Sequence, residues 1–303
     1  MRLILKLFSA AILVQSSILN GMISGTTFES AEKPKFKNAE EVHRFIDASY
    51  REMIRKYYTE KTIKEHNLDV FSELISKNYY ASGEWVKSTH MDSGDSNFKN
   101  LSCFEKVKAL CDKIDGNAFL LFLDACSKEF QAIYKFKGEE SYESQPTFVF
   151  KAKLGEEFDI CGDPHGSIYT ILHAIKCIQT GRRFIIDGDV MDRGIKPFLS
   201  KLNLVQSIIF NALGLGVLTG RGNHEFLPSA GNDWPVFQDF WAEPNWCTDE
   251  AYKEFKENTS GEHTQNLNYH LKCILPSIIM IIPPNENNHA VVVSHSPFVD
   301  IVV

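Results

Sequence analysis

The chain has 303 residues, of which 44% are hydrophobic and 23% are charged, and its formal net charge is −7. This composition is typical of a globular protein with a sizeable core, and it excludes a wholly disordered chain. The negative net charge argues against a protein that binds nucleic acid through its overall charge. An anionic substrate would have to be attracted by local positive charge or by a bound metal.

The N-terminus carries Arg2 and Lys6 and continues as a largely apolar run from Leu7 to Leu19. This pattern is typical of a secretory signal peptide, and the run is too short for a transmembrane helix. We therefore expect a signal peptide at 1–24, a protein of the secretory pathway or a secreted one, and no stable membrane span. A buried N-terminal helix in a cytoplasmic protein is the alternative. The seven cysteines form no CxxC pair or zinc-type spacing, and their pairing stays open.

From Lys33 to about Asn100 the sequence is polar and charged and has helical periodicity. Asn38, with Glu41 three residues later, indicates a helix start, and apolar residues follow at helical spacing: Val42, Phe45, Ile46 and Met53. A second helix is expected in "NLDVFSELISKNYY" at 67–80. The run at 88–100 is rich in Ser, Asp, Gly and Asn, which predicts a linker or long loop. A further helical stretch is expected at 104–136.

After Pro146 the pattern changes to strands alternating with helices. Phe148 and Phe150 alternate as strand residues do, and five further short runs are strand candidates: "FDIC", "RRFIID", "GVLTG", "SIIMII" and "AVVVS". Helical spacing is found at 168–178, with Gly181 at the expected C-cap, and again at 199–209. The sequence therefore predicts an α/β unit with a partly parallel sheet.

Polar clusters follow directly after four of these strands. "GDPHG" (162–166), "GDVMDRG" (188–194) and "RGNHE" (221–225) each follow a strand, and His295 follows "AVVVS". Because ligands gather beyond the carboxyl ends of strands in such sheets, these loops can converge on one site. Asp, His and Asn suit divalent cations of hard to borderline character, and a carboxylate can bridge two of them. The guanidinium of Arg193 matches the oxygens of a phosphate group.

These motifs closely resemble the GDxHG, GDxVDRG and RGNHE signatures of the phosphoprotein phosphatase (serine/threonine phosphatase) family, within the calcineurin-like metallophosphoesterases. The similarity covers about 104–303. It implies an α/β fold, a metallophosphoesterase-type β-sandwich flanked by helices, here C-terminally incomplete and preceded by a helical extension. The expected division is a signal peptide at 1–24, a helical extension and linker at 25–101, and the phosphoesterase domain at 102–303.

The resemblance also implies a role for each matching side chain. Two divalent metal ions, manganese first with iron or zinc as alternatives, would be held by five residues: Asp163, His165, Asp189, Asn223 and His295. His224 would be the general acid, oriented by Asp192. Arg193 and Asn223 would bind the phosphate of the substrate. The implied reaction is the hydrolysis of phosphoserine or phosphothreonine in proteins by a metal-activated hydroxide, with a phosphoprotein as partner and an unknown regulatory partner.

The sequence departs from the family pattern at several positions. Pro164 and Ser167 replace usual residues of the first motif, the stretch after Glu225 differs, and Ser296 and Pro297 stand where the family has glycines. The family also continues beyond the last residue printed here, with a further histidine and arginine. Two alternatives therefore stay open: a catalytically impaired, phosphatase-like binding module, and an esterase acting on nucleotides or phosphotyrosine. The substrate, the metal, the oligomeric state and the role of 25–101 also stay open.

Overall fold

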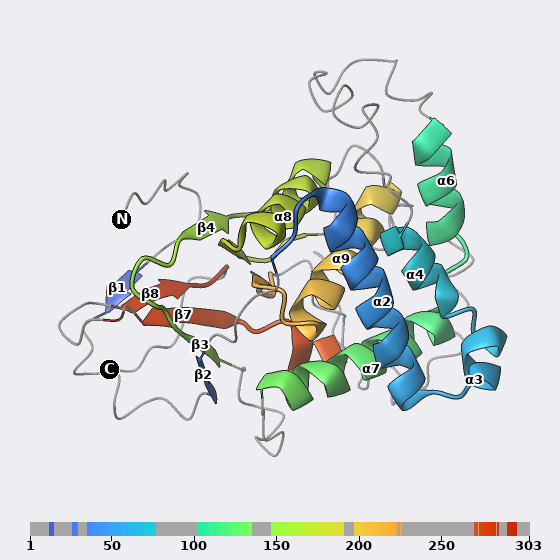
Figure 1. Ribbon diagram of the computed structural model, residues 1–303, viewed down its shortest axis with the longest axis horizontal. Helices are drawn as coiled ribbons and strands as arrows, with labels where there is room; N and C mark the ends of the chain where they lie inside the picture. The colour runs from blue at the N-terminus through green and yellow to red at the C-terminus, as the bar shows by residue number, and fades with distance from the viewer. Residues whose placement is uncertain are drawn as a thin grey trace, which may run out of the picture.

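The computed structural model describes a set of ranges that covers most of the predicted elements: 12–14, 26–29, 35–76, 102–134, 147–190, 197–222, 225, 270–271, 273–282, 284 and 290–295. Figure 1 shows the labelled strands on one side of the molecule and most of the helices on the other. The loop expected at 88–100 lies outside the described residues.

The N-terminal helices are α2 (Ala39–Tyr57), α3 (Glu60–Glu65) and α4 (Asp69–Ser76). The predicted start of α2 is confirmed, because Asn38 Oδ1 accepts a hydrogen bond from the backbone N–H of Glu41 at 2.9 Å. The apolar face of α2 is buried as its spacing predicts, except that Phe45 is 37% exposed. Burial of this face, more than helix propensity, stabilises such a helix.

The helical stretch expected at 104–136 is two helices, α6 (Ser102–Cys111) and α7 (Gly116–Tyr134). The prediction of one stretch was wrong at the connection between them. Asp115 Oδ1 accepts a hydrogen bond from Ala118 N at 2.7 Å, so this carboxylate caps a new helix at that point. Lys201 Nζ donates to the carbonyl oxygens of Cys111 and Ile114 at 2.6 and 3.1 Å, which places a cation at the end of α6.

One sheet consists of three parallel strands in the order β4 (Phe158–Cys161), β5 (Arg183–Ile186) and β6 (Val217–Thr219). The connections run through α8 (Ile168–Thr180) and α9 (Pro197–Ala212). Gly181 has a φ of 73° and ends α8, as its position predicts. The partly parallel sheet is thereby confirmed.

The other sheet has five strands in the order β1-β8-β7-β3-β2. They are, in chain order, β1 (Ile12–Val14), β2 (Thr26–Glu29), β3 (Thr147–Lys151), β7 (Ile278–Ile282) and β8 (Ala290–Val293). Strand β3 is parallel to β2 and β7, whereas β8 is antiparallel to β7 and β1.

Strand β1 lies within the segment expected to be a signal peptide. The location of the protein in the cell stays a prediction. Within the part of the chain that the structure describes, helices of sufficient length and apolar character to span a membrane are absent.

The two sheets pack face to face around an apolar cluster. Phe148, Phe150, Ile279 and Ile281 reach it from one sheet, and Ile185 and Leu218 from the other. The opposite face of the β4–β6 sheet packs against α8 and α9. The residues between this face and the two helices belong to a second apolar cluster, which continues into α2, α4, α6 and α7. Within it, the ring of Phe71 stacks on that of Phe122 with ring centroids 4.2 Å apart. The expected mixed α/β sandwich with helices, N-terminal ones included, is confirmed. The boundary at residue 102 stays a prediction.

Candidate metal centre

Four of the predicted site residues meet where β4, β5 and β8 end. Asp163 follows β4, Asp189 follows β5 and His295 follows β8, and one donor atom from each lies within 4.8 Å of the others. His295 lies between the carboxylates, with Nδ1 3.2 Å from Asp163 Oδ1 and Nε2 3.0 Å from Asp189 Oδ2. His165 Nε2 is 3.9 Å from the same Asp189 oxygen. The structure thus brings together donors that lie far apart in the sequence.

The electrostatics of this group depend on its burial. The side chain of Asp189 is 4% exposed and that of His295 is 10% exposed, whereas Asp163 is 43% exposed. The hydrogen bond to Asp189 raises the pKa of His295 to about 9, although burial of the ring opposes this change. Charge attraction to Asp189 and Asp163 adds to the increase in pKa. A protonated His295 ring therefore balances part of the negative charge of the two carboxylates.

The loops that carry these ligands are joined by backbone hydrogen bonds. His165 N donates to the carbonyl oxygen of Asp189 and Gly166 N donates to that of Val190, both at 2.9 Å. His165 and Asp189 have φ values of 41° and 49°, in the left-handed region that residues other than glycine rarely adopt. Such strained residues cluster at functional sites, where the surrounding structure holds them in place.

Two glycines let the loops after β5 and β6 approach each other. A Cβ atom on Gly188 would lie 2.6 Å from Gly222 Cα, and one on Gly222 would lie 2.8 Å from Asp189 Cγ. Gly188 also has a φ of +108°. A larger residue at either position would have to move the backbone that carries Asp189.

Glu225 is a residue of this site whose role was not predicted from its sequence motif. It is 1% exposed, and its Oε2 accepts hydrogen bonds from Asp189 N and Gly222 N, both at 2.8 Å. One carboxylate oxygen therefore fixes the backbone of Asp189 relative to the loop after β6. The available signal was the acidic residue that closes the "RGNHE" motif.

Arg221, in the same loop, ties it to the start of β7. Its Nη2 donates to Ser277 Oγ at 2.7 Å and its backbone N donates to the carbonyl oxygen of Pro276 at 3.0 Å. Burial lowers the pKa of Arg221 to about 10, and the charge of Glu225 opposes this change. Arg221 therefore stays a cation at neutral pH and contributes to the positioning of this loop.

Four predicted site residues lie outside the described residues: Asp192, Arg193, Asn223 and His224. Their roles in acid catalysis, phosphate binding and metal binding stay predictions.

The donors that the structure places together fit a divalent cation. They are two carboxylates and two imidazoles, the oxygen and nitrogen ligands that manganese, iron and zinc accept. Because one donor atom from each of Asp163, Asp189 and His295 lies within 4.8 Å of the others, one cation could reach all three side chains. The identity and the number of the metal ions are not fixed by this geometry.

Comparison with known proteins identifies two similarities. The family model of the calcineurin-like phosphoesterases matches 157–298, a range that contains all four residues of the group. The chain is also 33% identical over 85 residues to a serine/threonine-protein phosphatase T from Trypanosoma brucei brucei (strain 927/4 GUTat10.1). That alignment covers 26% of this chain and 17% of the length of the trypanosome protein.

Proposed function

We propose that this chain, whose residues 157–298 match the family model of the calcineurin-like phosphoesterases, hydrolyses phosphate monoesters on proteins with the help of two divalent cations. The observation that carries the proposal is the convergence of Asp163, Asp189 and His295, with His165 beside them. When bound there, divalent cations would stabilise negative charge on phosphoryl oxygens and lower the pKa of coordinated water.

The burial of each residue in the centre indicates which role it would have in binding the cations. Asp189 is buried between His295 and His165 and would contact both cations, whereas the more exposed Asp163 would contact one. Because the side chain of Asp163 is 43% exposed, we expect a phosphate on a protein surface to approach from its side. Glu225 keeps the backbone of Asp189 in place and needs no contact with the substrate.

The finer part of the proposal concerns the substrate and the proton. Similarity to a serine/threonine-protein phosphatase supports phosphoserine and phosphothreonine as the substrate class. A serine or threonine alkoxide is a poor leaving group, so it needs a proton as the P–O bond breaks. His224, oriented by Asp192, would donate that proton, while Arg193 and Asn223 would bind the phosphate oxygens.

Hydrolysis assays with added manganese test the reaction. We expect the chain to hydrolyse p-nitrophenyl phosphate and a phosphoserine peptide, and Asp189→Asn to lower both rates about 100-fold or more. Asp112→Asn, at an exposed carboxylate directly after the end of α6, is the matched control and should keep both rates. Equal rates in all three proteins would show that the chain is not a hydrolase of this kind and would favour a phosphate-binding module.

A comparison of leaving groups tests the proton donor. p-Nitrophenolate is a good leaving group and depends little on protonation, whereas a serine alkoxide depends on it strongly. His224→Asn should therefore slow the peptide reaction much more than the p-nitrophenyl phosphate reaction. An equal loss on both substrates would remove His224 from the role of general acid.

A substrate panel tests the substrate class. Peptides carrying phosphoserine, phosphothreonine or phosphotyrosine are compared with a dinucleoside polyphosphate. We expect kcat/KM to be highest for the phosphoserine or phosphothreonine peptide. A preference for the dinucleotide would contradict the protein substrate and leave the hydrolase activity standing.

A further inference from the structure

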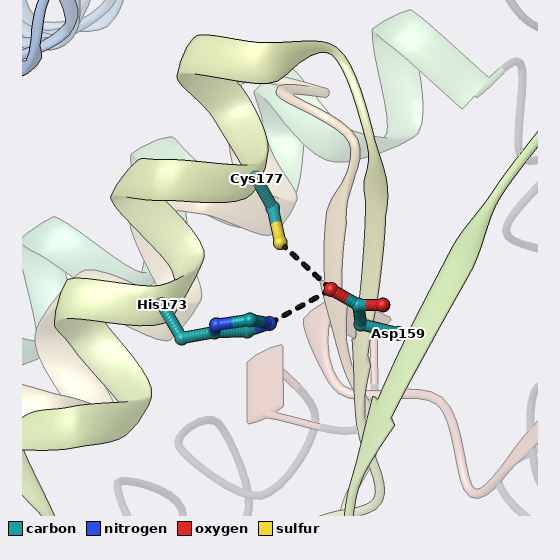
Figure 2. A group of neighbouring side chains, drawn as sticks. All are labelled: Asp159, His173 and Cys177. Carbon is teal, nitrogen blue, oxygen red and sulfur yellow. Dashed lines mark hydrogen bonds and ion pairs between the residues drawn. The ribbon is translucent and has the colours of Figure 1, made fainter. Parts of the chain in front are cut away.

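A second group of metal-ligating side chains lies between β4 and α8, apart from the metal centre. Figure 2 shows Asp159 on β4 facing His173 and Cys177 on α8. Asp159 Oδ2 is 2.8 Å from His173 Nε2 and accepts a contact from Cys177 Sγ at 3.4 Å. Asp159 lies within β4, whereas Asp163 lies in the loop that follows this strand. The two groups share no residue.

The sequence places these three side chains together through two periodicities. His173 and Cys177 are four residues apart, so they lie on one face of α8. On β4, Phe158 and Ile160 pack toward the cluster between the sheets. Because side chains alternate along a strand, Asp159 points to the opposite face, where α8 packs. The three side chains are brought together only by the packing of α8 against the sheet, and no short sequence motif contains all of them.

We propose that Asp159, His173 and Cys177 form a binding site for a zinc ion that connects α8 to β4. With usual zinc bond lengths and tetrahedral angles, the ligand oxygen would lie about 3.3 Å from the nitrogen and about 3.6 Å from the sulfur. The distances in the structure are 2.8 and 3.4 Å. Side-chain shifts of a few tenths of an ångström would therefore make room for the cation.

The other carboxylate oxygen of Asp159, Oδ1, is bound by an arginine side chain. Arg182 Nη2 donates to Asp159 Oδ1 at 2.6 Å, and Arg182 Nε lies 3.0 Å from Glu157 Oε2. This leaves Asp159 Oδ2 directed at His173 and Cys177. Outer contacts of this kind orient a metal-binding carboxylate.

Binding would release protons and keep the charges balanced. Cys177 loses its thiol proton to solvent and binds as the thiolate, and His173 binds through Nε2 with its proton on Nδ1. The thiolate and the Asp159 carboxylate together match the two charges of the cation. His173 is 46% exposed, so a cation can enter from its side and a water molecule can take the fourth position.

The ligand set selects a different metal from the one expected at the metal centre. A thiolate favours zinc over manganese, whereas the donors around His295 are oxygen and nitrogen atoms. The zinc ion would join the strand before the "GDPHG" loop to the helix after it. Because the ion binds the folded state, it would also raise the free energy of unfolding.

Cobalt(II) absorption tests the proposal, because cobalt replaces zinc and a thiolate ligand gives an intense charge-transfer band in the near ultraviolet. The full chain is stripped with a chelator and titrated with cobalt. We expect this band in the wild-type protein and its loss in Cys177→Ser. His173→Gln, at a partly exposed position, should weaken cobalt binding at this site about 10-fold or more.

Matched controls separate this site from the metal centre and from other thiols. Cys126→Ala, at a buried thiol on α7, should keep the band, and so should Asp189→Asn. Zinc titration by calorimetry should find one more tightly bound ion per wild-type chain than per Cys177→Ser chain. The proposal is overturned if saturating cobalt gives no charge-transfer band, or if the band persists in a folded Cys177→Ser protein. Neither result bears on phosphate hydrolysis.

Discussion

Gly222 lies directly against the carboxylate of Asp189, so that a Cβ atom at residue 222 would stand 2.8 Å from Asp189 Cγ and even closer to its backbone nitrogen. The atoms that this Cβ would meet belong to the backbone and side chain of Asp189, a proposed metal ligand, so they cannot move aside without moving the site. The glycine is therefore required by the position of Asp189, and the loops after β5 and β6 form one structural unit.

The first prediction is that Gly222→Ala disables the metal centre while the fold persists. The added methyl group must displace Asp189, and displacements near 1 Å at a catalytic group cost about 100-fold in rate. We expect a loss of that size in the hydrolysis of p-nitrophenyl phosphate, together with weaker manganese binding in calorimetry. Far-ultraviolet circular dichroism should remain that of the wild type.

Gly155→Asn is the control for this substitution. Gly155 has a φ of +80° in the turn between β3 and β4, and a Cβ atom there would meet nothing within 4 Å. Asparagine tolerates this backbone conformation better than most residues. The control should keep its activity, and a Gly222→Ala protein that is as active as the control would contradict the argument.

The second prediction concerns Glu225, whose Oε2 receives the backbone N–H groups of Asp189 and Gly222. Glu225→Ala leaves two buried donors without this acceptor, which costs roughly 1–3 kcal/mol for each. Glu225→Gln keeps a carbonyl oxygen that can accept from both. We expect urea unfolding to show a large loss of stability for the alanine variant and a smaller one for glutamine.

Manganese affinity separates a positioning role from a purely structural one. If Glu225 positions Asp189, the affinity should fall in the alanine variant and recover substantially in the glutamine variant. Unchanged manganese affinity in a destabilised Glu225→Ala protein would show that the residue supports the loop without positioning the ligand.

The order of strands, helices and ligand loops could be predicted because the signals are local. Apolar runs such as "RFII" stop at Gly-Asp turns, and parallel neighbours β4 and β5 then place Asp163 and Asp189 at one edge. The role of Glu225 could not be predicted, because it depends on a backbone N–H 36 residues earlier in the chain. Sequence motifs are recognised from the spacing of residues along the chain, whereas the contact of Glu225 with Asp189 depends on how two loops approach each other in the fold.

Two other features were missed for related reasons. The break between α6 and α7 depends on a single cap by Asp115, which competes with a helical pattern that continues on both sides. The group of Asp159, His173 and Cys177 combines strand and helix periodicities, and cysteine spacing alone does not indicate it. A periodicity in the sequence predicts one helix or one strand, and it does not predict which side chains of two such elements meet.

The third prediction is that the N-terminal helices α2, α3 and α4 unfold together with α6–α9 and the sheets. Phe71 of α4 is fully buried and stacks on Phe122 of α7, within the same cluster that holds α8 and α9. Phe71→Ala should lower the free energy of unfolding by about 3–5 kcal/mol. Thermal unfolding followed by circular dichroism and by residual activity should shift equally.

Leu154→Ala is the control, because Leu154 is 85% exposed, and its effect should stay within about 0.5 kcal/mol. Two independent units would give another result. Phe71→Ala would then shift the unfolding signal of the helices and leave the temperature of activity loss unchanged.

The last prediction is a loss of stability in mild acid that originates partly from His43. Its ring is 2% exposed, Nδ1 lies 3.2 Å from the carbonyl oxygen of Ile75, and burial lowers the pKa of the ring below 6.5. As the pH falls through 6.5, His43 becomes protonated in the unfolded chain but stays neutral in the folded chain. The free energy of unfolding therefore decreases. It decreases until the pH reaches the lowered folded pKa. His270, whose pKa burial also lowers, adds to the same trend.

Urea unfolding of the wild type and of His43→Gln between pH 7.5 and 5.5 measures this contribution. Glutamine does not titrate, so the variant should lose less stability over this range, whatever its stability at pH 7.5. The slope that remains in the variant should decrease again when His270→Gln is added. Identical slopes in the wild type and His43→Gln would mean that His43 takes up its proton equally in the folded and unfolded states, and the burial argument would fail.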